Sequence, residues 1–285
     1  MKKEISISLL ALSLAACGGD SGSNANEGEN SSKITISSYS SAEATDTSPV
    51  GTWIAVRSNI HFTDDVQDYT FQSRELFTIN EQGDNYLINS CDGFISRSSV
   101  AKDAFLTDDI EDSESDNYSE KSKQTFTSNI NFTGNSVYTE KVTGEGNEAD
   151  SEQKWIKTTD AIKISDTTDL QENISITSQN TDLSHDKIDI KCANFREGTD
   201  GLSTVNINSP DNLSFTLENG ATDEDHGIYF ESENLTFEAF KDDDENDVID
   251  ISYEITNNTV DNYSVTAIYS EPSRSATFNV SVDFK

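Results

Sequence analysis

The stretch Val248-Ile249-Asp250-Ile251-Ser252-Tyr253-Glu254-Ile255 alternates between two kinds of side chain with a period of two. One side of the alternation carries only large apolar residues, and the other is mainly polar. Successive side chains of a β-strand point to opposite faces, so this pattern predicts a strand with one buried face. Residues 277–284 alternate in the same way, which predicts a second such strand near the C-terminus.

Short strand-like segments also make up the remaining chain. Residues 76–79 and 86–88 are apolar runs joined by the Gly- and Asn-containing stretch 81–85, which predicts a hairpin. Clusters of turn residues recur at intervals typical of a sandwich or a barrel. No window after the first 16 residues carries a helical stripe. The sequence therefore predicts an all-β fold, either an antiparallel barrel or a sandwich.

The division of these β segments follows from composition. We expect an antiparallel β domain over 50–207 and a C-terminal β region over 208–285, which belongs to the same unit or forms a second one. Residues 107–123 are acidic and poor in apolar side chains, so we expect a solvated loop that is mobile or disordered. A cation-binding or partner-binding loop is the functional alternative for this segment.

The N-terminus has the features of an export signal. Lys2 and Lys3 precede an apolar segment over residues 5–16. This segment is too short for a transmembrane helix, which needs about 20 residues, so residues 1–16 are typical of a secretory signal peptide. Residues 17–49 are rich in Gly, Ser, Asn, Glu and Thr, and this composition predicts a flexible tether.

The last four residues of this N-terminal signal region, Leu14-Ala15-Ala16-Cys17, resemble the lipobox of bacterial lipoproteins. The resemblance implies that Cys17 receives a diacylglycerol and becomes the mature N-terminus. Two or more acyl chains anchor a protein stably, whereas one chain binds only marginally. We therefore expect a lipid-anchored protein of the bacterial cell envelope, in the outer membrane and facing the periplasm or the surface. An ordinary signal peptide with a chance cysteine is the alternative.

Charge limits the classes of partner. The formal net charge is −34 at pH 7. A field of this sign excludes nucleic acid as a partner and opposes electrostatic binding to anionic lipid. Attachment to the membrane is therefore expected through the N-terminal lipid alone.

Two cysteines, Cys91 and Cys192, remain once Cys17 carries lipid. Exported proteins fold in an oxidising compartment, so we expect these two thiols to form a disulfide. Two separate buried thiols are the alternative. The three histidines, His61, His185 and His226, show no ligand spacing, so no metal site is predicted.

Motifs that carry chemistry are missing from the sequence. It contains no Gly-rich phosphate loop, no His-Glu-x-x-His and no nucleophile elbow after a strand. We therefore expect no enzyme activity and no cofactor. The acidic run 242–247 resembles the start of a calcium loop, but it lacks the glycine of the sharp turn and a distant bidentate carboxylate. A solvated turn explains this run better.

A further resemblance concerns Gly51-Thr52-Trp53, which is similar to the Gly-x-Trp start of lipocalins and lipocalin-like bacterial lipoproteins. Thr159-Asp160 resembles the later Thr-Asp motif of that family, although Ala161 stands where an aromatic residue is expected. The resemblance implies an eight-stranded barrel with Trp53 packed across its closed end. It also implies a small apolar ligand.

The sequence thus favours a lipid-anchored envelope lipoprotein with an all-β binding or interaction domain, whose partner is an envelope protein. A lipocalin-like carrier of a small apolar ligand is the first alternative. An envelope enzyme whose site is assembled from scattered residues is the second.

The lipobox yields a direct prediction. Cys17→Ser removes the only thiol available for acylation, so the variant should incorporate no fatty acid and should stay soluble or unprocessed. Metabolic labelling with a fatty-acid analogue measures this, with the wild-type chain as the positive control. Incorporation of label into the variant would contradict the lipoprotein interpretation.

Overall fold

The computed structural model describes residues 34–41, 43–45, 47–91, 95, 98–144, 150–179, 190–199, 203–209, 213–219, 226–232, 235–240 and 250–285. The signal peptide, Cys17, His185 and the acidic run 242–247 lie outside these residues, so the expectations placed on them stay predictions. Within the described part of the chain, no helix has the length and hydropathy required to cross a membrane.

Antiparallel strands form almost all of the described secondary structure, which confirms the predicted all-β class. The 3₁₀ helices are η1 (Ile36–Ser38) and η2 (Lys102–Ala104), and the strands are β1 (Gly51–Thr63), β2 (Val66–Gln82), β3 (Asn85–Asn89), β4 (Ser99–Ala101), β5 (Asp109–Glu114), β6 (Tyr118–Ser128), β7 (Asn131–Val142), β8 (Ser151–Ser165), β9 (Ile174–Gln179), β10 (Cys192–Gly198), β11 (Ser203–Ser209), β12 (Leu213–Asn219), β13 (Gly227–Ser232), β14 (Leu235–Phe240), β15 (Asp250–Asn258), β16 (Asn262–Glu271) and β17 (Arg274–Asp283).

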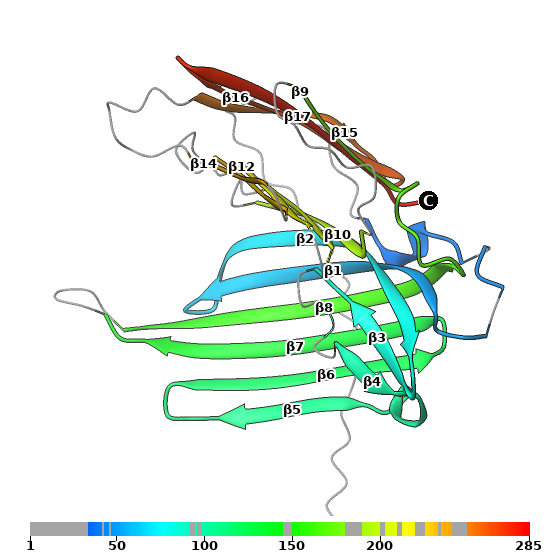
Figure 1. Cartoon of the computed structure of the whole chain (residues 1–285). Coiled ribbons are helices and arrows are strands. Elements are labelled where there is room, and N and C mark those ends of the chain that lie inside the picture. The colour runs from blue at the N-terminus through cyan, green and yellow to red at the C-terminus, as the bar shows by residue number, and fades with distance from the viewer. Residues whose placement is uncertain are drawn as a thin grey trace, which may run out of the picture. The chain divides into compact units, whose positions relative to one another are not determined.

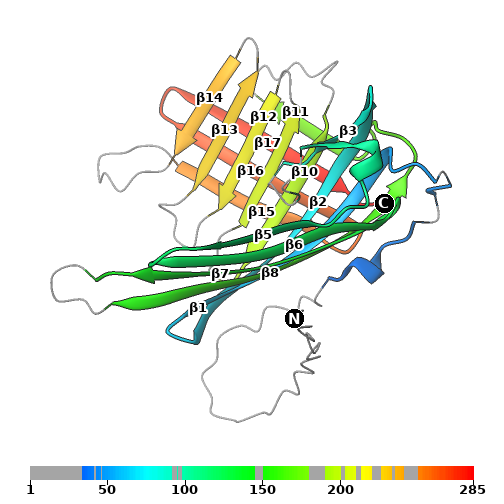
Figure 2. The same ribbon diagram turned by 90° about the horizontal axis from the view of Figure 1, so that it is seen from below.

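The strands form two sheets (Figure 1). The larger sheet has 13 strands in the order β14-β13-β12-β11-β10-β2-β1-β8-β7-β6-β5, with β3 on β2 and β4 on β3. Figure 2 shows β10 to β14 continuing side by side from β2, whereas β8 to β5 continue from β1. The smaller sheet has the order β15-β16-β17-β9. No pairing joins β14 to β5 among the described residues, so the sandwich and not the closed barrel is the arrangement observed.

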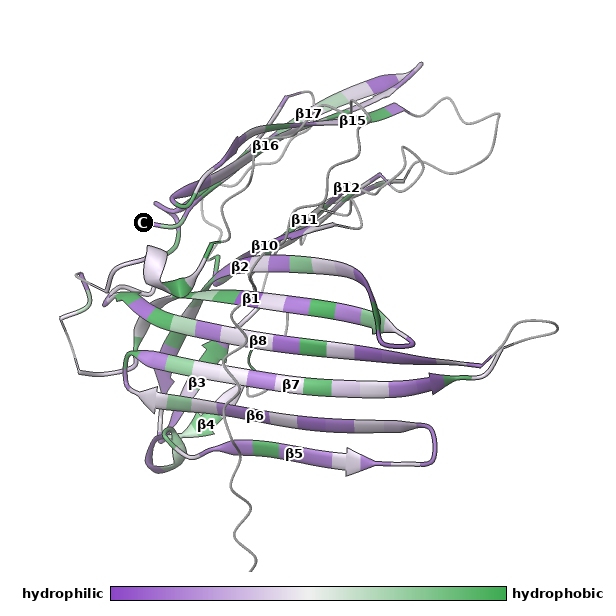
Figure 3. Ribbon diagram, turned by 180° about the vertical axis from the view of Figure 1, so that it is seen from behind, coloured by the Kyte–Doolittle hydropathy of each residue, from purple (hydrophilic) through white to green (hydrophobic). Residues whose placement is uncertain are grey.

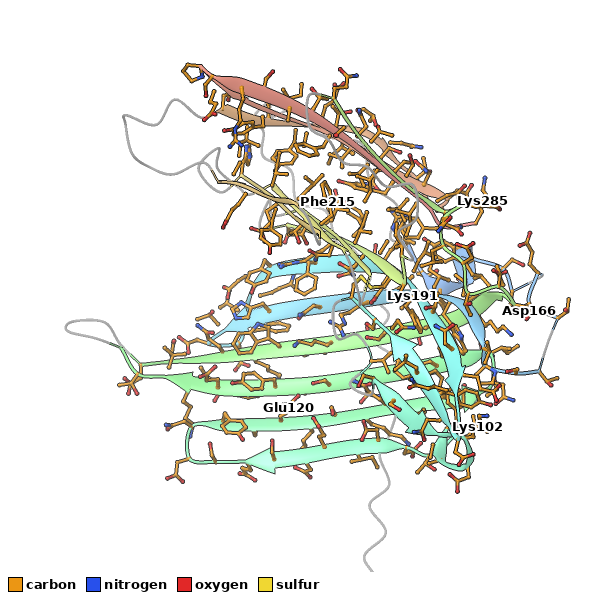
Figure 4. All side chains as sticks on the ribbon, viewed as in Figure 1. Lys102, Glu120, Asp166, Lys191, Phe215 and Lys285 are labelled. Carbon is orange, nitrogen blue, oxygen red and sulfur yellow. A yellow bond between two sulfur atoms is a disulfide. The ribbon has the colours of Figure 1, made fainter. Side chains whose placement is uncertain are left out.

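The main core lies between the two sheets. Phe195 of β10 stacks on Tyr263 of β16 at 3.5 Å between ring centroids, and Phe215 of β12 contacts Phe278 of β17 at 5.9 Å. Figure 4 places Phe215 between β12 and the smaller sheet. Hydrophobic and hydrophilic residues alternate along the strands (Figure 3), as expected for strands that bury one face.

A second core lies on the opposite face of β1 and β2. Trp53 is fully buried there against Phe77 and Phe126, and its indole Nε1 donates a hydrogen bond to the Pro49 carbonyl at 2.8 Å. Gly51 has φ of 146°, and a Cβ at this position would lie 2.1 Å from the Ser165 carbonyl oxygen. Only glycine therefore fits at position 51, and this local steric requirement holds although the sheet does not close into a barrel.

The Cys91–Cys192 disulfide forms as predicted, with the two Cα atoms 5.6 Å apart. The position of the disulfide follows from the pairing of β2, because two strands pair with the same edge of β2. Strand β10 pairs with Phe71 to Phe77, and β3 pairs with Thr78 to Gln82. The disulfide joins the start of β10 to the residues that follow β3.

Arg74 of β2 connects the two sheets. Its side chain is 2% exposed, and its guanidinium donates hydrogen bonds to the Val260 carbonyl at 3.1 Å and to Asn258 Oδ1 at 3.0 Å. The same group lies 4.4 Å from the centre of the Phe284 ring. Arginine carries five N–H donors, so it can satisfy several acceptors of the β15–β16 turn at once.

The expected acidic loop over 107–123 is wrong, because most of this segment forms the hairpin of β5 and β6. The composition of this segment gives its number of carboxylates but not the residues that lie opposite them across the hairpin. In the structure Lys121 lies opposite Asp112, and Lys123 Nζ lies 2.7 Å from Asp108 Oδ2. Cross-strand pairs of opposite charge stabilise a ladder.

The expected tether over 17–49 is wrong for its last part. Ile36 and Tyr39 pack against the main core, and Pro49 is buried. The backbone N–H of Thr45 also donates to Asp166 Oδ2 at 2.9 Å. The few apolar residues of this polar stretch therefore hold it against the β domain.

The expected division at residue 208 falls inside β11, and β9 from the first part pairs with β17 from the second. Residues Ile34–Lys285 form one compact unit. The C-terminal region therefore belongs to the same unit, which was one of the two alternatives.

The disulfide yields a stability prediction. It closes a sequence separation of 101 residues, for which the chain-entropy account gives about 4–5 kcal/mol of stabilisation. In a Cys17→Ser background, the Cys91→Ala/Cys192→Ala variant should lose unfolding free energy of that order in urea titration. Thiol counting on the unfolded, unreduced Cys17→Ser protein should find no free thiol, and two free thiols would contradict the pairing.

Candidate functional site

One face of the larger sheet continues from the second core toward the β1–β2 turn. Alternate side chains of a strand share a face, so Trp53, Arg57, Asn59 and His61 of β1 all point to this side. The residues opposite them on β2 and β8 share this face, and so do the residues of β10 that lie opposite those of β2. Beyond the apolar core, this face carries polar, cationic and aromatic side chains in turn.

Three of its polar residues, Asn194, Ser73 and Asn59, form a line that we call the polar diagonal. They lie on β10, β2 and β1, and are 1%, 0% and 3% exposed. Ser73 lies opposite Arg196 on β10 and opposite Arg57 on β1. Asn194 lies two residues before Arg196 on β10, and Asn59 lies two residues after Arg57 on β1, so the three residues cross the strands diagonally. Diagonal neighbours in a sheet are about 7–8 Å apart.

Four buried side-chain atoms of the polar diagonal have no hydrogen-bond partner in the described part of the chain. This holds for both Nδ2 and Oδ1 of Asn194, for Oγ of Ser73 and for Oδ1 of Asn59. A buried polar group that lacks a partner costs about 1–3 kcal/mol, and most such groups in proteins are paired. Three on adjacent strands of one face are therefore unusual.

Three cationic residues border the polar diagonal. Arg57 Nε donates to Thr159 Oγ1 at 3.3 Å, and the guanidinium of Arg196 lies 4.0 Å from the centre of the Phe71 ring. Lys157 of β8 lies directly opposite Asn59. The same face also carries the carboxylates of Glu75, opposite Asn194, and of Asp68, beside His61.

An aromatic row crosses the sheet at the end of the polar diagonal. It consists of Tyr69, His61, Trp155 and Tyr138, on β2, β1, β8 and β7. The successive distances between ring centroids are 4.6, 4.8 and 5.0 Å. Trp155 and Tyr138 are half-buried. The aromatic row thus offers apolar ring surface beside the buried polar groups.

Carboxylates lie close to two members of the aromatic row. Tyr138 donates a hydrogen bond to Glu140 Oε2 at 3.0 Å, and this hydrogen bond raises the pKa of the Tyr138 phenol. His61 Nδ1 lies 2.9 Å from Asp68 Oδ2. That approach lacks hydrogen-bond geometry, and neither ring nitrogen of His61 has a hydrogen-bond partner among the described residues.

The arrangement does not form a nucleophile with a base. Ser73 and His61 share the face, but Ser73 is opposite Arg57 whereas His61 is opposite Tyr69. Four residues along a strand correspond to about 13 Å, which is far beyond hydrogen-bond reach. Ser73 and His61 therefore do not form a nucleophile–base pair.

A cluster of potential metal ligands also has a structural role. Ligand atoms of Glu75, Cys91 and Cys192 lie within 4.8 Å of one another, but the two cysteines are bonded and offer no thiolate. The buried Glu75 carboxylate accepts hydrogen bonds from the Cys91 backbone N–H and, at 3.2 Å, from Ser90 Oγ. It fixes the segment after β3.

His226, the other described histidine, lies in contact with the smaller sheet. Its Nδ1 is 3.0 Å from the Ile251 carbonyl oxygen, and its ring packs on Tyr253. It contributes to packing and directly precedes β13, which is distant from the aromatic row in the sheet order.

No known protein family matches the chain, and no curated protein is significantly similar to it.

Sequence reasoning missed the polar diagonal. The alternation Trp53, Ala55, Arg57, Asn59, His61 contains the only signal, because a polar run that continues an apolar face marks a change of role along that face. Without the register, Asn59 cannot be connected with Ser73 or Asn194.

The missing partners yield a prediction on stability. Ser73→Ala removes a buried hydroxyl that forms no hydrogen bond with any described residue, so the free energy of unfolding should stay equal or rise by up to about 1 kcal/mol. Thr78→Val is the matched control. The Thr78 hydroxyl is also fully buried, but it donates to the Lys191 carbonyl and accepts from Asn89 at 3.0 Å.

The control should lose about 1–3 kcal/mol, because its removal leaves buried partners unpaired. Urea unfolding of both variants in parallel measures the difference. A loss at Ser73→Ala as large as that at Thr78→Val would show that Ser73 has a structural partner.

Proposed function

We propose that this chain is an exported, lipid-anchored protein of the bacterial envelope whose all-β domain binds a polar ligand. The binding site is the face that carries the polar diagonal and the aromatic row. The observation that carries the proposal is the set of three buried polar side chains on adjacent strands, each with at least one atom that has no hydrogen-bond partner among the described residues. These atoms are closed to solvent, so a ligand reaches them only after flanking side chains such as Arg57 and Arg196 move. Hydrogen bonds to the ligand would then offset the cost of burying the atoms.

Attachment to the membrane rests on the lipobox residue Cys17. The disulfide supports export, because such bonds persist in oxidising compartments and are rare in the cytosol. The outer membrane remains the proposed location. An envelope protein that presents the ligand is the proposed partner, and nucleic acid is excluded by charge.

The two alternatives lack a supporting observation. A lipocalin-like carrier requires an apolar interior open to a ligand, whereas the described side chains of the main core pack on one another. An envelope enzyme requires convergent reactive groups, and Ser73 and His61 are too far apart along their strands. We therefore propose a binding protein and no catalysis.

A ligand screen tests the proposed function. Thermal unfolding of the full chain is followed with single amino acids, nucleosides, organic acids and uncharged oligosaccharides. A ligand present at about 100 times its Kd should raise the Tm by about 5 °C or more. The Asn59→Ala/Asn194→Ala variant should show no such rise.

Asn135→Ala is the matched control, because Asn135 is exposed on the opposite face of β7. It should keep the full rise in Tm. The proposal fails if no compound class stabilises the wild type, or if the double variant is stabilised equally.

A further inference from the structure

We propose that the outer edge of β5 docks an extended, lysine- or arginine-bearing segment of another protein, which adds to the larger sheet as a further strand. This edge is separate from the face that carries the polar diagonal, so the inference goes beyond the proposed function. Three features of β5 carry it: its outer backbone edge, its charge and the apolar side chains beside it.

Strand β5 ends the larger sheet (Figure 1), and its backbone is regular. In the described part of the chain, β6 is the only strand that pairs with β5, and their register from Asp109 to Glu114 contains no shift. Proteins commonly blunt a sheet edge with a bulge, and β15 at an edge of the smaller sheet has a register shift between Ile255 and Asn257. Strand β5 lacks this protection along its whole length.

The hydrogen-bond pattern shows which backbone groups of β5 point away from the sheet. The Ser115 N–H donates to the Tyr118 carbonyl at 2.8 Å, and this pair continues the register of β5 on β6. Alternate residues of an antiparallel strand bond to the same neighbour. The residues two and four positions before Ser115 therefore also bond to β6, whereas Ile110, Asp112 and Glu114 direct their N–H and C=O groups outward. Outward groups of this kind are the ones with which an added strand pairs.

The charge of β5 favours one kind of added strand. Glu111 and Glu114 lie opposite serines of β6, so the existing ladder places no cation opposite their carboxylates. Asp112 lies opposite Lys121, which shows that β5 already pairs with a lysine-bearing neighbour. Opposite charges stabilise a ladder and like charges destabilise it. A basic segment is therefore favoured, whereas a second copy of β5 would bring the carboxylates of two strands together.

The field of the whole chain favours the same partner. With a formal net charge of −34 at pH 7, the protein attracts a basic segment from solution and repels acidic ones. Complementary charge of this kind raises the association rate and suppresses wrong partners. The carboxylates of β5 thus oppose self-association and select a basic strand at the same edge.

Large apolar side chains lie exposed along this edge. Ile110 in β5 is 64% exposed, and Leu106 before the strand and Tyr118 after the β5–β6 turn are also exposed. Cross-strand neighbours on one face contact each other, so an added strand would cover Ile110 with a residue of its own. The partner segment is therefore expected to combine basic residues with apolar ones.

Fluorescence anisotropy of labelled peptides tests the proposal on the full chain. The salt concentration is about 0.15 M, at which exposed charges more than ~8 Å apart are largely screened. The probe is a heptapeptide of alternating lysine and valine, blocked at both ends. Its matched control carries N-methyl groups on the three central residues, which keep the charge and the side chains but remove backbone N–H donors. We expect a Kd below about 0.1 mM for the probe and binding about tenfold weaker or less for the control.

A proline substitution in the chain tests the backbone pairing from the other side. Asp112→Pro removes an outward N–H and no bond of the β5–β6 ladder. The strand should persist, because proline is tolerated on an edge strand where the N–H faces solvent. The variant should weaken probe binding about tenfold or more, since the proline ring also blocks the approach of a strand. Asp112→Asn, which loses the charge alone, should weaken it less than about threefold.

Charge variants locate the docking edge. Glu111→Gln/Glu114→Gln should weaken probe binding about fivefold, because two cross-strand charge pairs are lost. The matched control, Glu172→Gln/Glu254→Gln, changes the net charge equally at two exposed positions outside β5. It should weaken binding less than about twofold.

Two results would overturn the proposal even if the probe binds. Equal binding of the N-methylated control would show that charge alone attracts the peptide. Equal weakening by Glu172→Gln/Glu254→Gln would show that the peptide does not bind at β5. If the probe does not bind at all, the carboxylates of β5 serve only to protect the edge.

Circular dichroism establishes that each variant is folded before it is titrated. If Asp112→Pro fails to fold, the two peptides compared on the wild-type chain still decide whether backbone pairing occurs. The ligand screen at the polar diagonal uses different residues, so the proposed function stands or fails independently of these outcomes.

Discussion

Strand β2 has to bond to two strands along a single edge, and the Cys91–Cys192 disulfide holds those strands end to end. The edge over Phe71 to Phe77 belongs to β10, and the edge over Thr78 to Gln82 belongs to β3. Strand β10 leads into the strands that cover the main core, whereas β3 and β4 cover the second core. Both cores therefore depend on one strand, and Arg74 of the same strand reaches the smaller sheet.

The fold class followed from local pattern, because a period of two reports directly which residues share a face. The disulfide followed from elimination and compartment. The acidic hairpin of β5 and β6 did not follow, since only the folded hairpin places Lys121 opposite Asp112 and Lys123 beside Asp108. Sandwich and barrel were equally compatible with the sequence, because closure depends on long-range pairing between edge strands.

At the candidate site, the local sequence pattern and the strand register lead to different expectations about burial. Local pattern treats Asn59, Ser73 and Asn194 as ordinary polar residues, whereas the register buries all three on one face. Positions at which a sequence violates the burial rule are expected to be functional, since folding alone would replace them with apolar residues. The same face brings Arg57, Lys157 and the aromatic row together from four different strands. No motif in the sequence joins these residues.

A high-resolution crystal structure of the full chain, grown without added ligand, tests the central claim most directly. The account predicts that Nδ2 and Oδ1 of Asn194, Oγ of Ser73 and Oδ1 of Asn59 form no hydrogen bond with another residue of the chain. Hydrogen bonds from these atoms to other residues of the chain would contradict it, because the polar diagonal would then be part of the fold.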